Sequence, residues 1–168
     1  MDVLVFIKEN HQALRARCSD LQAEAGIKAR RALMESLSKD LELHLRLEQE
    51  YLYPELSGLF SGADVLTATG LANGAAIRRR LKAMVKLVAQ PAAEQSTYPA
   101  KLQELLDSVA AHFDLEEQTL MPKIRDAMRT EDREDLGEVL VETKADLALN
   151  DEPKPVVAAQ QTKTRKRA

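Results

Sequence analysis

The 168-residue chain lacks the residues that mark several classes of protein. Its single cysteine, Cys18, excludes an intrachain disulfide and the cysteine clusters that hold structural zinc or iron–sulfur centres. Tryptophan is absent and aromatic residues make up 4 %, so Leu, Ala, Val, Ile and Met must build the core. Glycine and proline occur only 6 times each, which favours helices over a β-sandwich or barrel.

Long hydrophobic runs and basic leader signals are also missing. No apolar stretch approaches the roughly 20 residues that a membrane-spanning helix needs. The N-terminus, MDVLVFIKEN, has neither the basic start nor the long apolar segment of a signal peptide. There is no glycine-rich phosphate loop. Together with the single cysteine, these features predict a cytoplasmic protein without a membrane partner.

The charge is unevenly distributed along the chain. The net charge is -3, yet the segment from residue 150 onward has five basic and two acidic residues, so the remaining body is acidic. An acidic body argues against nucleic-acid binding. The segment 150–168 combines two prolines, a polar run and a basic end, which predicts a disordered tail. A protein partner that contacts this tail or the helix before it stays an open alternative.

Apolar residues recur at spacings of three and four along most of the chain, which predicts five helices. Asp2 is a capping residue for the first helix, and Gly26 is its break. The later helices are expected over about residues 27–54, 63–90, 102–120 and 131–149. Pro54 and Pro122 should bend or end the helices that contain them. A local alternation of leucines, LELHLRL, resembles a strand, but the helical period on both sides outweighs it.

The expected fold class is all-α. Four long helices with short connections are typical of an antiparallel up-down bundle, which would cover residues 1–128. Residues 129–149 form an additional amphipathic helix in this interpretation, and residues 150–168 form the tail. The apolar face of the additional helix is expected to consist of Leu136, Val139, Leu140 and Leu147.

The chain contains an internal repeat. Residues 44–54 read HLRLEQEYLYP and residues 112–122 read HFDLEEQTLMP, with five of eleven positions identical. A shorter match pairs NHQALR at 10–15 with NGAAIR at 73–78. In a bundle with two-fold pseudo-symmetry, the equivalent inward positions would meet at one level. These positions are His11, His44, Glu48, Gly74, His112 and Glu116.

All three histidines of the chain occupy these inward positions. A His and a Glu four residues apart lie on one helix face, and the repeat supplies two such pairs. Two carboxylates in a leucine-rich core are costly unless each has a partner. The residues therefore indicate either a metal ion or a polar core satisfied by its own hydrogen bonds, and we favour the metal.

The motifs H…HLRLEQEYLYP…IR…HFDLEEQTLMP resemble the hemerythrin-like family of HHE cation-binding domains over about residues 1–125. The resemblance implies a four-helix bundle with a non-haem, usually di-iron, centre. It implies that His11 and His112 ligate one metal, that His44 ligates the other, and that Glu48 and Glu116 bridge them. It also implies reversible binding of O2 or another diatomic such as NO, iron handling, or sensing or repair in oxidative or nitrosative stress.

The chain departs from the family pattern at Gly74, where the third-helix histidine is missing. The site would then hold one metal on His11, His112, Glu48 and Glu116, hold two unequal metals, or stay empty. We favour iron in a mononuclear or asymmetric site, although manganese and zinc suit the same ligands. Asn73 and Tyr51 are candidate replacement ligands.

Two other classes of function stay open at this level. A metal-free helical module would keep the scaffold and contact a partner through the fifth helix or the tail. An oxidase-like enzyme would use the same iron, but the sequence offers no separate acid or base. We therefore expect a binding or sensing protein rather than an enzyme.

Overall fold

A computed structural model describes residues 1–149, and the predicted disorder of residues 150–168 lies outside the described residues. The all-α prediction is confirmed, because residues 1–149 contain helices and no strand. The long helices begin and end close to the predicted positions. They are α1 (Val3–Ala23), α2 (Ile27–Leu47), α4 (Ala63–Val88), α5 (Tyr98–Leu115) and α7 (Thr130–Leu149). The short ones are α3 (Tyr53–Glu55), α6 (Met121–Ala127) and the 3-10 helix η2 (Ala92–Glu94).

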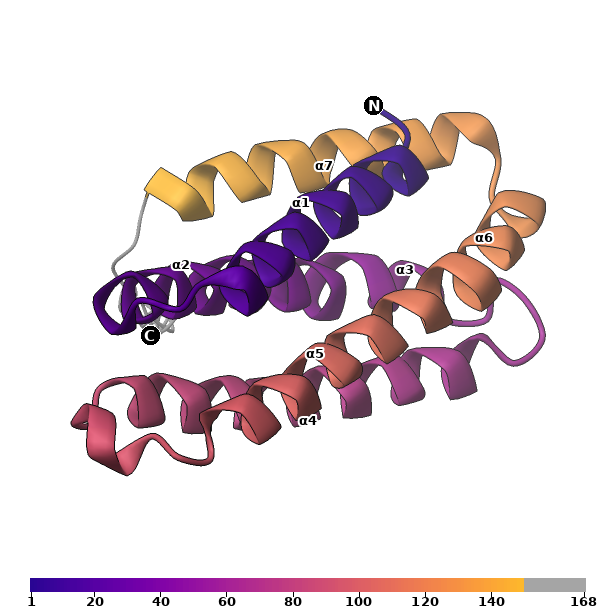
Figure 1. The fold of residues 1–168 in the computed structure, drawn as a ribbon. Helices are drawn as coiled ribbons and strands as arrows, with labels where there is room; N and C mark the ends of the chain where they lie inside the picture. The colour runs from indigo at the N-terminus through magenta and orange to yellow at the C-terminus, as the bar shows by residue number, and fades with distance from the viewer. Residues whose placement is uncertain (150–168) are drawn as a thin grey trace, which may run out of the picture.

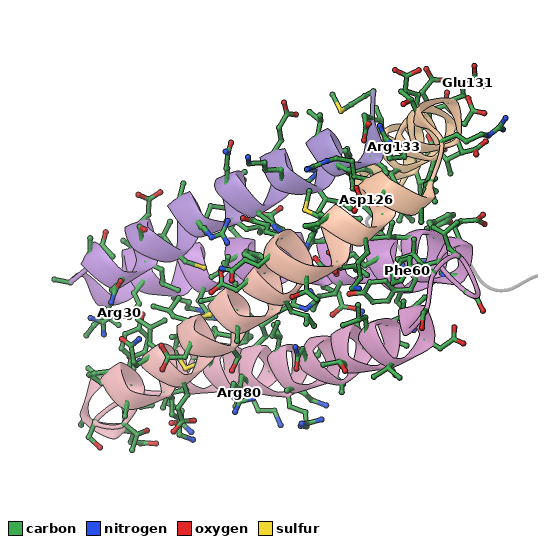
Figure 2. All side chains as sticks on the ribbon, turned by 90° about the vertical axis from the view of Figure 1, so that its right-hand side faces the viewer. Arg30, Phe60, Arg80, Asp126, Glu131 and Arg133 are labelled. Atoms are coloured by element: carbon green, nitrogen blue, oxygen red, sulfur yellow. The ribbon has the colours of Figure 1, made fainter. Side chains whose placement is uncertain are left out.

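The four-helix bundle consists of α1, α2, α4 and α5. Figure 1 shows α4 and α5 side by side, with α7 running along α1. Charged side chains such as Arg80 on α4 and Glu131 on α7 point outward (Figure 2). Inside, two apolar clusters fill the bundle. One includes Leu21, Met34, Leu41 and Leu105, and the other includes Val3, Leu52, Leu56 and Ile124.

The polar residues of the repeat lie between these two apolar clusters. On α1, buried Ile7 belongs to one cluster and buried Leu14 to the other, with His11 between them. On α5, Val109 belongs to the first cluster, and Leu120 beyond the helix end belongs to the second. The bundle thus encloses a polar layer with hydrocarbon on both sides, which excludes bulk water from it.

Helical structure continues past both prolines of the repeat, by one residue to Glu55 after Pro54 and to Ala127 after Pro122. Each is preceded by one π turn, η1 (Glu48–Leu52) and η3 (Glu116–Leu120), in which a backbone N–H bonds five residues back. The Tyr53 N–H donates to the Glu48 carbonyl, and the Met121 N–H donates to the Glu116 carbonyl. Proline has no N–H and clashes with the carbonyl four residues before it, so the wider turn lets the helix pass through it.

The additional helix α7 is fixed to the start of α1. Arg133 Nε donates to Asp2 Oδ2 at 2.8 Å, while Asp2 Oδ1 caps α1 by accepting from the Leu4 N–H. Gly137 is buried so closely against the N-terminal backbone that a Cβ there would lie 2.8 Å from the Val3 nitrogen. Leu140 is buried in the core as expected.

Val139 does not follow the predicted apolar face of α7. It is 45 % exposed, because the helix packs on α1 and α2 through neighbouring positions. Val139 instead lines a surface groove of about 440 Å³ between α7 and the end of the second bundle helix. The other lining residues are Glu50, Tyr51, Glu55, Asp132, Asp135 and Leu136.

Candidate metal centre

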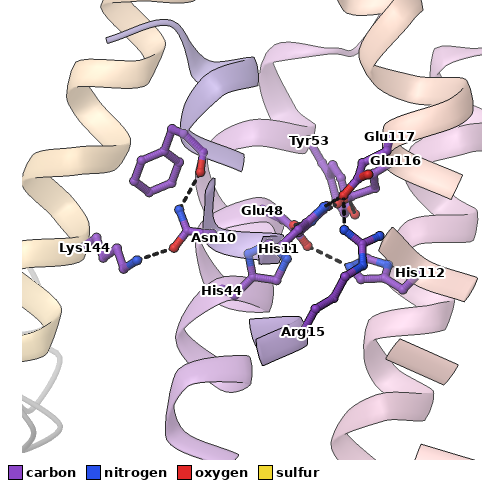
Figure 3. A network of polar contacts seen from close by, with 11 residues as sticks. Asn10, His11, Arg15, His44, Glu48, Tyr53, His112, Glu116, Glu117 and Lys144 are labelled. Atoms are coloured by element: carbon purple, nitrogen blue, oxygen red, sulfur yellow. Dashed lines mark hydrogen bonds and ion pairs between the residues drawn. The ribbon is translucent and has the colours of Figure 1, made fainter. Parts of the chain in front are cut away.

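Four side chains from four segments converge in the polar layer. His11 comes from α1, His44 from α2, Glu48 from η1 and Glu116 from η3, and all four are buried. One ligand-type atom from each lies within 4.8 Å of the others, as Figure 3 illustrates. The helical spacing of four residues within each His-Glu motif places both side chains of a motif on this inner face.

The contacts of Glu48 link the three histidines. His44 Nε2 lies 2.6 Å from Glu48 Oε1, and His112 Nε2 lies 3.0 Å from Glu48 Oε2. His11 Nε2 lies 3.9 Å from Glu48 Oε1 and 3.2 Å from Glu116 Oε2. His112 therefore contacts the Glu48 oxygen that His44 does not contact. The four ligand-type atoms that converge come from His11, His44, Glu48 and Glu116, and His112 is not among these residues.

The atoms that face the centre of this group are not satisfied by hydrogen bonds. Within residues 1–149, no partner with hydrogen-bond geometry reaches four buried atoms. They are His11 Nε2, His44 Nε2, Glu48 Oε1 and Glu116 Oε2. These four atoms lie against one another at ion-pair distances, with His44 Nε2 2.6 Å from Glu48 Oε1 and His11 Nε2 3.2 Å from Glu116 Oε2, so no well-formed hydrogen bond offsets the cost of burying them. Imidazole nitrogens and carboxylate oxygens that converge in this way fit a divalent cation.

The two central carboxylates differ in their electrostatics. Burial alone would raise the pKa of Glu48, but His44, His11 and His112 hold it well below its usual range. The pKa of Glu116 is raised, first by burial and then by the charge of Glu48. Two buried carboxylates this close together therefore favour a site with added positive charge.

Comparison with known protein families agrees with this geometry. The family model described as the hemerythrin HHE cation-binding domain matches residues 2–124. The chain belongs to this family. No curated protein and no solved structure matched the chain. Residues 129–149, which include the whole of α7, lie beyond the part that the hemerythrin family model covers. Within residues 1–149, no helix is long and apolar enough to cross a membrane.

Tyr53 is a site residue that the sequence reasoning missed. Its hydroxyl donates to Glu116 Oε1 at 2.6 Å, and the residue is 5 % exposed. Burial and the charges of Glu48 and Glu116 raise the pKa of Tyr53, so the hydroxyl keeps its proton. Its ring packs on Gly70, where a Cβ would lie 2.8 Å from Tyr53 Cζ and closer still to the hydroxyl oxygen. In this hemerythrin-family chain the tyrosine thus enters the polar layer beside α4.

Gly74, where the sequence analysis expects the third-helix histidine of the family pattern, lies on the same face of α4, one turn after Gly70. A Cβ at Gly74 would lie 3.3 Å from Leu45 Cδ2. The leucine therefore lies against the backbone at the position from which an imidazole would project. Of the candidate replacement ligands, Asn73 is half-buried beside Gly74, whereas Tyr51 lines the groove along α7.

Glu117 is the second residue that the sequence reasoning missed. Its Oε1 lies 2.7 Å from His11 Nδ1 and 2.6 Å from Arg15 Nη1. The His11 ring also stacks on Phe113, with centroids 3.9 Å apart. Cys18, on the same stripe of α1 as His11, is partly buried, and burial raises its pKa to about 11, so it stays an uncharged thiol.

Proposed function

We propose that this hemerythrin-family chain binds non-haem iron in an asymmetric or mononuclear site. His11, His44, Glu48, His112 and Glu116 are the proposed ligand set. The observation that carries the proposal is the convergence of four buried atoms without hydrogen-bond partners among residues 1–149. Manganese and zinc accept the same ligands, and iron is preferred because the resemblance to hemerythrin-like domains implies a non-haem iron centre.

The proposed role is reversible binding of O2 or of another small diatomic such as NO, in oxygen handling or in sensing iron and redox stress. Bound iron would supply an open coordination position and one-electron chemistry. The chain supplies the surroundings: apolar clusters above and below exclude water, and the Phe113 ring holds that of His11. Tyr53 presents a hydroxyl to Glu116 on the side of α4 that lacks a histidine. A single cysteine is in keeping with the proposed cytoplasmic location.

The test is metal content per chain after anaerobic loading with Fe(II), with absorption spectra before and after O2. We expect one tightly held iron, or two of unequal affinity, and a new absorption band on addition of O2 or NO. His44→Ala should remove the tightest iron, because it deletes the imidazole nearest Glu48 Oε1. An exposed-site variant, Arg31→Ala, is the matched control and should bind as the wild type does.

The alternative is a metal-free helical interaction module. The groove between α7 and η1–α3 favours it, since acidic side chains surround the apolar Leu136 and Val139. Such a groove suits a partner with basic and apolar side chains. Failure to bind Fe, Mn or Zn, together with a melting midpoint that does not respond to chelator, would favour this module over the metal centre.

A further inference from the structure

The two halves of the repeat each bring an arginine to the residue that follows the central glutamate. In the first arrangement, Arg15 from α1 reaches Glu117, which follows Glu116. In the second, Arg78 from α4 reaches Gln49, which follows Glu48. Arg15 and Arg78 occupy the same position of the NHQALR and NGAAIR repeats. The two contacts are therefore equivalent under the pseudo-symmetry of the bundle.

The two equivalent contacts differ in the residue on their core side, which is His11 in one half and Gly74 in the other. Glu117 Oε1 receives Arg15 Nη1 at 2.6 Å and also lies 2.7 Å from His11 Nδ1 (Figure 3). Arg15 lies over the Phe113 ring, 5.2 Å from its centroid, and is thereby held beside the same imidazole.

The counterpart of His11 in the other half is Gly74, which has no imidazole to support. There Arg78 donates to Gln49 Oε1 at 3.0 Å and to both oxygens of Glu42 at 3.0 and 2.9 Å. The half with His11 thus has the Glu117 carboxylate over the imidazole, and the half with Gly74 has the neutral amide of Gln49.

We propose that Glu117, held in place by Arg15, is the positioning residue that directs His11 Nε2 into the metal centre. This role rests on the proposed iron-binding function. An imidazole has two nitrogens, so fixing Nδ1 on a carboxylate leaves Nε2 to face Glu116 and Glu48. A carboxylate on the far nitrogen fixes the orientation of a ligating imidazole and makes it a better donor.

The location of this contact separates it from an ordinary surface ion pair. The His11 side chain is 0 % exposed and that of Glu117 is 25 % exposed, so the bond spans the edge of the core. A single oxygen of Glu117 serves both Arg15 and His11, so moving either partner moves the other. Gln49 offers the matched control, because it has an equivalent arginine contact and no histidine beneath it.

The experiment compares Glu117→Ala and Glu117→Gln with Gln49→Ala. Fe(II) affinity is measured anaerobically by competition with a chelator of known affinity. We expect Glu117→Ala to weaken the tightest iron by about 10–100-fold, the range typical of lost outer-shell carboxylates. Glu117→Gln should lose less, because its amide oxygen still accepts from His11. Gln49→Ala should bind as the wild type does.

A second readout uses the metal-free protein. The Nδ1 proton of His11 should give a slowly exchanging, low-field NMR signal in the wild type and in Gln49→Ala, and Glu117→Ala should lose it. Equal iron affinity in Glu117→Ala and the wild type overturns the role, as does an equal loss in Gln49→Ala. Weaker iron binding with the His11 signal intact overturns it too. A wild type that binds no iron refutes the proposed function, whereas these outcomes refute the Glu117 role alone.

Discussion

Alanine substitution of the two inward glycines of α4 should have opposite effects on stability. Gly70 and Gly74 lie on the same helix face, but only the first has the Tyr53 ring against it. A Cβ at Gly70 would lie 2.8 Å from Tyr53 Cζ, too close for any real Cβ contact. A Cβ at Gly74 would lie 3.3 Å from Leu45 Cδ2, the far end of a flexible side chain, which can shift by a few tenths of an ångström.

The magnitudes follow from three contributions. Replacing a helix-interior glycine by alanine stabilises by about 0.5–1 kcal/mol. Overpacking a core costs about 1–3 kcal/mol, and losing a hydrogen bond to a charged group costs about 1.5–3 kcal/mol. Gly74→Ala should therefore change the free energy of unfolding by between zero and about +1 kcal/mol. Gly70→Ala, which displaces Tyr53 from Glu116, should lose about 2–5 kcal/mol.

The assay is urea unfolding of the metal-free protein followed by circular dichroism. Tyr53→Phe removes the atom nearest the new methyl group, so the double variant Gly70→Ala/Tyr53→Phe should lose less than the sum of the single losses. Equal stability of Gly70→Ala and Gly74→Ala would refute the placement of Tyr53 against α4. So would strict additivity of the Gly70 and Tyr53 substitutions.

Three further outcomes are expected. Burial lowers the pKa of His11, but Glu116 and Glu48 outweigh it and raise the pKa to about 9 from 6.5. This stabilisation is complete below pH 6.5, so urea unfolding of the metal-free protein should show stability falling towards pH 9, by up to about 1.4 kcal/mol per pH unit. Iron affinity should rise over the same range, and His11→Gln should flatten both trends. Gly74→His/Gln49→Glu should bind a second iron more tightly than Gly74→His alone, as iron titration would show; equal affinity would contradict the pairing of carboxylate and imidazole. Gly137→Ala should undock α7, seen as faster hydrogen exchange in α1 and α7, because its Cβ would meet rigid backbone.

The helices and their inward-facing residues were largely predictable from the sequence, because both follow from apolar residues recurring at spacings of three and four. His11, His44 and His112 fall on stripes of apolar residues at spacings of three and four, and all three are buried. The leucine alternation at 41–47 did not form a strand: Leu41, Leu45 and Leu47 are buried within and at the end of α2. The helical period on both sides decided the outcome.

Tyr53 was not predicted as a site residue because the regular α-helical period of 3.6 residues was assumed to continue through residues 48–52, which instead form a π turn. With 3.6 residues per turn, Tyr51 is three residues beyond Glu48 and shares its face. The π turn at 48–52 adds a residue, so the Tyr53 N–H bonds to the Glu48 carbonyl and the tyrosine side chain reaches Glu116. Pro54 was the available signal, since a helix that continues through a proline must widen or kink before it.

Gly74 raised the question of whether the centre is adapted or damaged, and the surrounding contacts favour adaptation. A truncated core side chain leaves a cavity that destabilises the fold. Here the neighbouring space is filled instead, with Leu45 Cδ2 at 3.3 Å from the position of a Gly74 Cβ and the Tyr53 ring against Gly70. Gln49 presents a neutral amide to Arg78, whereas Glu117 at the equivalent position of the other half presents a carboxylate to Arg15. Since these features lie on three different segments, introducing a histidine at position 74 alone should leave a second site incomplete.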